Sequence, residues 1–264
     1  LLRRINKERI QNPDTFPTPF VVSKDIVIEH LGEPMMDFQR IAESPQVGTV
    51  NGMYATEMGT GGLTVIHATE IPSKEALSIT CTGQLGEVMK ESVTCARSVL
   101  LNVLPDDVKQ KLQDKPFGLH LHAEEASVKK EGPSAGGAIT LCLISQILGV
   151  PIRNDLSLTG EINPKGMIKK IGGLPAKLRG AKRAGVTHAL VPRANEKDYL
   201  KILEKDPTLI DKDFRVTIVD TIHDVLENAL MPGHGFKFKR NDGSLPTIME
   251  EREEDLLELD SSAK

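Results

Sequence analysis

The chain turns at Lys130-Glu131-Gly132-Pro133-Ser134-Ala135-Gly136-Gly137, a glycine-rich segment that opens directly into an apolar run from Ala138 to Leu148. Such a run predicts a buried helix. Ser134 would stand at the first turn of this helix, where backbone N–H groups lack intrahelical partners. With the N–H groups of Ser134 and Ala135 beside it, its hydroxyl would lie where an acyl oxyanion is stabilised. Ser134 is therefore a candidate nucleophile, and the alternative is a serine that only caps the helix.

A second segment places a lysine near the start of a predicted helix. Pro175 reads as the first helical residue and Gly185 as the stop signal, with apolar residues at helical spacing between them. Lys177 thus falls in the first turn, where the helix dipole disfavours an ammonium by roughly 0.3–1 kcal/mol. Lys177 is either a solvated surface residue or an amine with a lowered pKa. Buried beside Ser134, it would favour the neutral form that can accept a proton from a hydroxyl.

These segments, together with others in the same order, resemble the proteolytic domain of LonA-type ATP-dependent proteases. The resemblance covers about Ile26 to Leu230. The matching pieces include Val47-Gly48-Thr49-Val50-Asn51-Gly52, Thr82-Gly83-Gln84-Leu85-Gly86-Glu87, His120-Leu121-His122, Gly132-Pro133-Ser134-Ala135-Gly136, Thr159-Gly160-Glu161, Lys177 and Lys182-Arg183-Ala184-Gly185. The resemblance implies a Ser-Lys dyad made by Ser134 and Lys177.

Thr159 is the third residue assigned to the site. A threonine hydroxyl can accept a hydrogen bond from an amine while donating elsewhere, so it could hold Nζ of Lys177 toward the serine oxygen. Without the resemblance, Thr159 reads equally as an ordinary β-branched strand residue. Glu161 is expected on the same strand face as Thr159, from where it could make a charge-assisted contact.

Two histidines precede the serine turn. On a strand, His120, His122 and Glu124 would project to one face, a spacing that also suits three metal ligands. The resemblance implies instead that His120 and His122 support the site without binding metal. Glu131 stands where many family members carry aspartate. The negative charge is kept, but one more methylene group changes how far the carboxylate extends from the backbone.

Composition sets broader limits. The 264 residues have a formal charge of −4, 3% aromatic residues and no tryptophan, so a nucleic-acid surface is not indicated. The three cysteines stand singly in apolar segments and read as buried thiols. We find neither a membrane-spanning stretch nor a signal peptide. These features predict a soluble intracellular protein of a reducing compartment, either cytoplasm or an organelle matrix.

The pattern along the chain predicts an α/β (α+β) fold with mixed sheets and packed helices. Strands are expected within 47–79, at 187–192 and at 214–219, and helices at 85–101, 196–204 and 222–230. The resemblance implies a fold of the ribosomal protein S5 domain 2 type. We assign residues 23–231 to the proteolytic domain, 1–22 to a linker or remnant of an upstream AAA+ module, and 232–264 to a charged, disordered tail.

The resemblance implies a serine endopeptidase that hydrolyses peptide bonds of unfolded or damaged proteins through an acyl-enzyme. It also implies a homo-hexamer, with ATP and magnesium bound only by the upstream AAA+ module. No cofactor or metal is expected in this chain, which has no GxxxxGK[ST] segment. Two alternatives remain open: a catalytically silent ring or binding module of the same fold, and an ATP-independent Ser-Lys processing peptidase.

Overall fold

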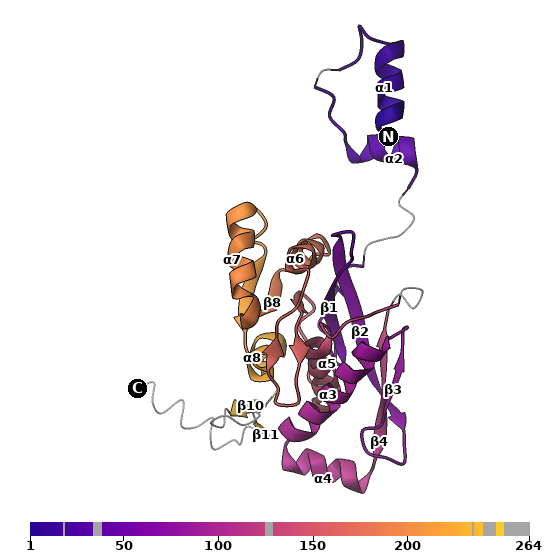
Figure 1. Cartoon of the computed structure of the whole chain (residues 1–264). Coiled ribbons are helices and arrows are strands. Elements are labelled where there is room, and N and C mark those ends of the chain that lie inside the picture. The colour runs from indigo at the N-terminus through magenta and orange to yellow at the C-terminus, as the bar shows by residue number, and fades with distance from the viewer. Residues whose placement is uncertain (18, 34–38, 125–128, 234, 240–246, 251–264) are drawn as a thin grey trace. The chain divides into compact units, whose positions relative to one another are not determined.

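The computed structural model of the chain describes residues 1–17, 19–33, 39–124, 129–233, 235–239 and 247–250 (Figure 1). They divide into two compact units, Leu1–Phe38 and Gln39–Lys264. The smaller unit contains helices α1 (Leu2–Gln11) and α2 (Lys24–Leu31). The stretch predicted as a linker therefore holds a helix, and its connection to an upstream module stays a prediction.

The larger unit is built on a seven-stranded sheet with the order β3-β4-β2-β1-β5-β8-β9. Neighbours β1 and β2, and β2 and β4, are antiparallel, whereas β3–β4, β1–β5, β5–β8 and β8–β9 are parallel. The strands are β1 (Thr49–Ala55), β2 (Gly61–Pro72), β3 (Ile79–Thr82), β4 (Phe117–Ala123), β5 (Leu156–Leu158), β8 (His188–Pro192) and β9 (Arg215–Val219). This mixed sheet with its helices confirms the predicted fold class.

The helices that were predicted in this unit lie within a few residues of their expected positions. Two further elements, the helix Asp106–Asp114 and the 3₁₀ turn Arg193–Asn195, were not predicted. In chain order, the helices of this unit are α3 (Glu87–Val103), α4 (Asp106–Asp114), α5 (Gly136–Leu148), α6 (Leu174–Arg183), the 3₁₀ turn η1 (Arg193–Asn195), α7 (Glu196–Lys205) and α8 (Ile222–Ala229). Two small hairpins complete the unit: β6 (Glu161–Ile162) with β7 (Ile168–Lys169), and β10 (Phe236–Lys239) with β11 (Thr247–Glu250).

Helix α5 is the centre of the larger core. It packs against β1, β2, α3 and α8, and every residue from Gly136 to Ser145 is buried. A helix that is apolar on all sides is stable only with neighbours all around it. A second buried cluster includes Leu178 of α6, Val191 of β8 and Phe214. The sheet thus carries one core under α5 and another under α6.

Two predictions differ from the structure. Cys142 is buried as expected, whereas Cys81 and Cys95 are only half-buried, and all three are free thiols. Part of the segment assigned to a disordered tail forms the β10–β11 hairpin, in which Ile248 is buried against the larger core. The acidic stretch after Glu250 lies outside the described residues.

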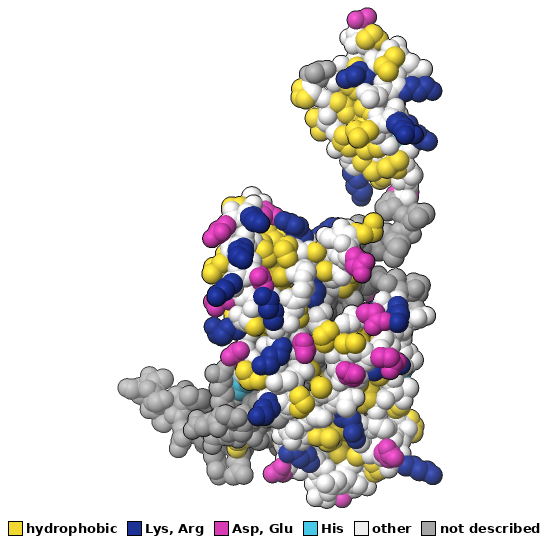
Figure 2. Space-filling view, viewed as in Figure 1, with side chains coloured by type: hydrophobic (Ala, Val, Ile, Leu, Met, Phe, Trp, Pro, Cys, Tyr) yellow, Lys and Arg dark blue, Asp and Glu magenta, His cyan; other side chains and the backbone are white. Residues whose placement is uncertain are grey.

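The surface agrees with the near-neutral composition. On the face shown in Figure 2, acidic and basic side chains are interspersed over the larger unit. Among the described residues, each helix is either too short or too polar to cross a membrane.

Candidate active site

Ser134 lies in the turn that precedes α5. The helix begins at Gly136 with Ala135 as its N-cap, so Ser134 stands just before the predicted first turn, and no side-chain hydrogen bond caps the helix. The structure therefore does not give Ser134 the role of a cap. Its carbonyl oxygen accepts hydrogen bonds from the Gly160 amide at 2.8 Å and from the Thr159 hydroxyl at 3.3 Å.

Two glycines allow this turn to approach the segment after β5. A Cβ on Gly136 would lie 2.8 Å from a methyl group of Ile162 and 2.9 Å from its amide nitrogen. Gly137 donates its amide proton to the Gly160 carbonyl at 2.9 Å. A larger residue at Gly136 would separate the serine turn from the segment after β5 that carries Thr159.

Backbone donors are available at the same turn. Neither the Ser134 nor the Ala135 amide donates a hydrogen bond to any atom of the described residues. Free amides at a helix N-terminus are suited to stabilising a developing negative charge on oxygen. The turn thus combines a hydroxyl and two donors within two residues.

Lys177 comes from α6 and points its amine into the protein. Gly173 starts the helix with φ 69°, a left-handed conformation that suits glycine. The Lys177 side chain is only 3% exposed, and its Nζ donates to Thr159 Oγ1 at 3.0 Å. Burial lowers the pKa of Lys177 from 10.5 to about 8, because desolvation disfavours the ammonium.

Thr159 joins the lysine to the serine turn. Its fully buried hydroxyl accepts from Lys177 and donates to the Ser134 carbonyl. The Ser134 hydroxyl, by contrast, makes no hydrogen bond within the described part of the chain, so it is not bonded directly to the amine. Catalytic hydrogen bonds often tighten only when substrate is present.

The histidines are arranged around another threonine. Nε2 of His120 lies 2.8 Å and Nδ1 of His122 2.7 Å from the Thr82 hydroxyl. Glu124, grouped with them from sequence, instead contacts Nε2 of His67 at 2.7 Å. The three side chains therefore do not converge as the metal-ligand alternative requires.

Within the described residues, the remaining predicted acids make no hydrogen bond or ion pair with the amine of Lys177. Glu131 forms an ion pair with Lys129, and its carboxylate lies against Gly86, the N-cap of α3. Glu161 begins β6, opposite Lys169 on β7. Hydrogen bonds thus join Lys177, Thr159 and the Ser134 turn, whereas within the described residues neither Glu131 nor Glu161 makes a side-chain hydrogen bond to them.

Sequence reasoning missed one residue that orders the approach to α6. The buried Asn195 side chain accepts from the Ile171 amide and donates to the Ile171 carbonyl, both at 2.9 Å. It therefore holds the backbone three residues before the helix. A single asparagine after Pro192 carries no sequence signal for this contact.

One group of side chains could offer metal ligands. Ligand atoms of His223, Asp224 and Glu227 lie within 4.8 Å of one another. Asp224 Oδ2, however, already accepts from the amides of Asp220 and Thr221 at 2.9 Å as part of the α8 capping box. This explains the position of Asp224 without an ion.

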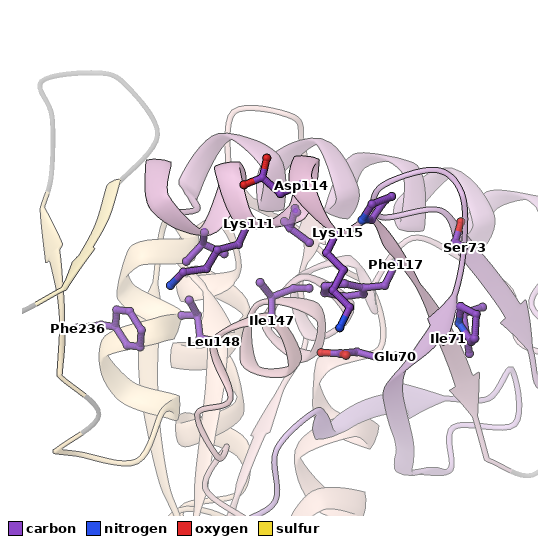
Figure 3. A pocket seen from close by; sticks show the side chains of 14 residues that line it. Glu70, Ile71, Ser73, Lys111, Asp114, Lys115, Phe117, Ile147, Leu148 and Phe236 are labelled. Carbon is purple, nitrogen blue, oxygen red and sulfur yellow. The ribbon is translucent and has the colours of Figure 1, made fainter.

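A groove of about 990 Å³ lies at the other end of α5 (Figure 3). Ile147 and Leu148, at the C-terminal end of the helix, line it together with Phe117 and Phe236. Because α5 has 13 residues, this end is about 20 Å from the serine turn. The groove is therefore separate from Ser134 and Lys177.

Comparison with known proteins gives one consistent result. Residues 21–232 match the family model of the Lon protease (S16) C-terminal proteolytic domain. The chain is 38% identical over 210 residues to a Lon protease of Fervidobacterium nodosum. The aligned region covers 80% of this chain and 25% of that protein. It is 36% identical over 212 residues to a Lon protease homolog of Acanthamoeba polyphaga mimivirus. That aligned region covers 78% of this chain and 21% of the mimivirus protein. The chain spans about a quarter of the length of these curated relatives.

Proposed function

Since the chain belongs to the Lon protease (S16) family and is a serine peptidase of that class, we propose that it cleaves peptide bonds with Ser134 as nucleophile and Lys177 as general base. The observation that carries the proposal is the 3.0 Å hydrogen bond from the buried Lys177 amine to Thr159, whose hydroxyl also reaches the Ser134 carbonyl. This contact holds a proton acceptor beside the serine turn.

The amine is suited to this role because it titrates near neutral pH. With a pKa of about 8, about a tenth of Lys177 is neutral at pH 7. Neutral NH₂ has a lone pair that can take a proton, which an ammonium lacks. Thr159 supports the role by accepting from Nζ and thereby fixing its direction.

In the proposed reaction, Lys177 Nζ takes the hydroxyl proton as Ser134 Oγ attacks the peptide carbonyl carbon. The ammonium then gives this proton to the leaving amine as the C–N bond breaks, which leaves an ester on Ser134. The neutral amine next takes a proton from water as the water oxygen attacks the ester carbonyl. The ammonium returns this proton to Ser134 Oγ as the C–O bond breaks, which releases the carboxyl product and restores both residues. The oxyanion of each step would accept hydrogen bonds from the Ser134 and Ala135 amides.

We further propose that the chain acts as the C-terminal part of a longer protein on unfolded polypeptides within a homo-hexamer. Its relatives are about four times as long as the matched region, which leaves room for an upstream AAA+ module. ATP and magnesium would bind that module alone. His120 and His122 would support the strand before the serine turn through Thr82.

The test measures cleavage of an unstructured fluorogenic peptide, which needs no unfolding activity. Ser134→Ala and Lys177→Arg should lose activity while remaining folded, because one lacks the nucleophile and the other cannot release its proton. His120→Ala and His122→Ala should only weaken cleavage. If Lys177→Arg cleaves at nearly the parent rate and either histidine variant is inactive, a Ser-His mechanism replaces this proposal.

A further inference from the structure

Helix α6 lies against the β1–β2 hairpin (Figure 1) with its backbone in direct contact with β2. A Cβ built on Gly180 would overlap the carbonyl carbon of Gly61 and the amide nitrogen of Gly62. A Cβ on Gly61 would overlap the carbonyl group of Ala176 from the strand side. Because these neighbours are backbone atoms, they cannot move aside as a flexible side chain could.

A hydrogen bond fastens the same contact. Arg183, one turn after Gly180, donates from Nη2 to the Gly61 carbonyl at 2.7 Å. The Gly61 backbone is also held by β1, because Gly61 pairs with Ala55 in the antiparallel ladder. Helix α6 is thus in contact with a strand, β2, whose position is fixed by its pairing with β1.

Lys177 belongs to the part of α6 that makes this contact. It follows Ala176 directly and lies three residues, nearly one turn, before Gly180. Any displacement of the helix from β2 would therefore carry the lysine with it. A misplacement of about 1 Å in a reacting group can reduce a rate by about 10²-fold.

We propose that the Gly61–Gly180 contact positions Lys177, setting how deeply its amine is held beside Thr159. Gly61 and Gly180 are positioning residues that act through the lysine. The inference rests on the proposed function where it concerns catalysis. The position of the amine itself can be measured without any activity.

The first test uses Gly180→Ala in the full chain, with Lys177 titrated by NMR of labelled lysine side chains. The extra methyl group should lift the helix and admit water, so the pKa of Lys177 should rise from about 8 by about one unit or more toward 10.5. The neutral fraction at pH 7 would then fall by about tenfold. We expect kcat at pH 7 to fall at least as far, with KM little changed.

Two further variants approach the contact differently. Gly61→Ala adds a methyl group from the strand side and should shift the titration in the same direction. Arg183→Gln adds no atom to the contact and replaces the guanidinium that donates to Gly61 with a shorter amide, so it should fold and give a smaller upward shift. An unchanged Lys177 titration in folded Gly180→Ala, or in Arg183→Gln if the glycine variants do not fold, would overturn the proposal.

Matched controls separate positioning from general damage. Gly172→Ala adds the same methyl group just before α6, where no atom of the described residues lies within 4 Å of the new Cβ, and should leave the titration unchanged. Leu112→Ala should lower the melting temperature without moving the titration, because Leu112 on α4 is buried in the other core cluster, which contains no residue of α6. A shift as large in either control as in Gly180→Ala would also overturn the proposal.

Failure of the proposed function would look different. If Gly180→Ala shifts the Lys177 titration while Lys177→Arg still cleaves peptide, the positioning inference stands and the assigned base is wrong. If Lys177→Arg is inactive and Gly180→Ala titrates as the parent does, the base stands and the positioning inference is wrong.

Discussion

At the scale of single residues, the charge of Lys177 should decide the pH dependence of activity. Its pKa of about 8 places the change from ammonium to neutral amine just above neutral pH. If Lys177 is the general base, kcat/KM should rise about tenfold per pH unit below pH 8 and level off above it. Peptide cleavage measured from pH 6 to 9.5 checks this. A rate that is constant over this range would argue against the lysine base.

Because it is buried, the ammonium form of Lys177 should lower the free energy of unfolding. The folded protein binds this proton less tightly than the unfolded chain, since the pKa falls from 10.5 to about 8. Stability should therefore rise with pH between these values, and the ammonium should be destabilising below pH 8. Replacing it with the apolar chain of Lys177→Met should stabilise the protein by about 1–3 kcal/mol at pH 7.

Urea unfolding at two pH values measures this effect. The advantage of Lys177→Met should be largest at pH 7 and should shrink toward pH 10.5, where the unfolded lysine also loses its charge. Lys201→Met, on α7 outside the site, serves as a control for removing a lysine charge. If Lys177→Met is less stable than the parent at pH 7, the hydrogen bond from the amine to Thr159 stabilises the fold by more than the burial of the ammonium destabilises it.

The sequence is most informative where local chemistry is unusual. Ser134 in a glycine-rich turn and Lys177 at a helix start are both conspicuous in the sequence, and the fold brings their segments together through Thr159. Glu131 could not be placed in the same way, because its direction depends on Gly86, distant in sequence. Asn195 was missed because its role consists of two hydrogen bonds to a backbone segment elsewhere in the chain.

At the scale of elements, a buried histidine joins the parallel strands. His188 on β8 is 1% exposed, its Nδ1 accepts from Arg215 at 3.2 Å, and its Nε2 lies 2.8 Å from the Thr217 hydroxyl on β9. Burial, reinforced by Arg215 and Arg153, lowers the pKa of His188 from 6.5 to about 4. The neutral imidazole therefore fits this position, and the imidazolium does not.

This arrangement predicts acid sensitivity of the β8–β9 pair. Between pH 6.5 and 4 the unfolded chain binds a proton that the folded His188 does not, so stability should fall as the pH falls through this window. The loss should reach about 3 kcal/mol by pH 4. Unfolding of the parent and His188→Gln from pH 7.5 to 4 measures it. Equal pH dependence in both proteins would contradict this role for His188.

Long periodic elements were predictable and short ones were not. The apolar face expected over 85–101 became α3, and the fully apolar run after the serine turn became α5. The β6–β7 hairpin has strands of two residues each, too few to show a period in sequence. The pairing of β1 with β5 was equally hidden, because only tertiary packing brings these strands together.

At the scale of the whole molecule, the two described units should differ in stability. Both large hydrophobic clusters consist of residues from Ile41 onward within the described part of the chain. A chain that begins at Gln39 should therefore keep its melting temperature within about 2 °C, because no residue of either cluster is lost. Calorimetry of both forms checks this. A drop of more than about 5 °C would mean that the first unit stabilises the second.

The sheet order has a consequence for how the enzyme is made. Asn51 of β1 pairs with Ser157 of β5, so the sheet cannot close until a long intervening stretch has been synthesised. Thr159 directly follows β5, and Lys177 comes later still. A nascent chain on the ribosome would therefore present the serine turn well before its base emerges. Under the proposed mechanism, an unfinished chain cannot cut its neighbours, and proteolysis begins only when synthesis has passed α6.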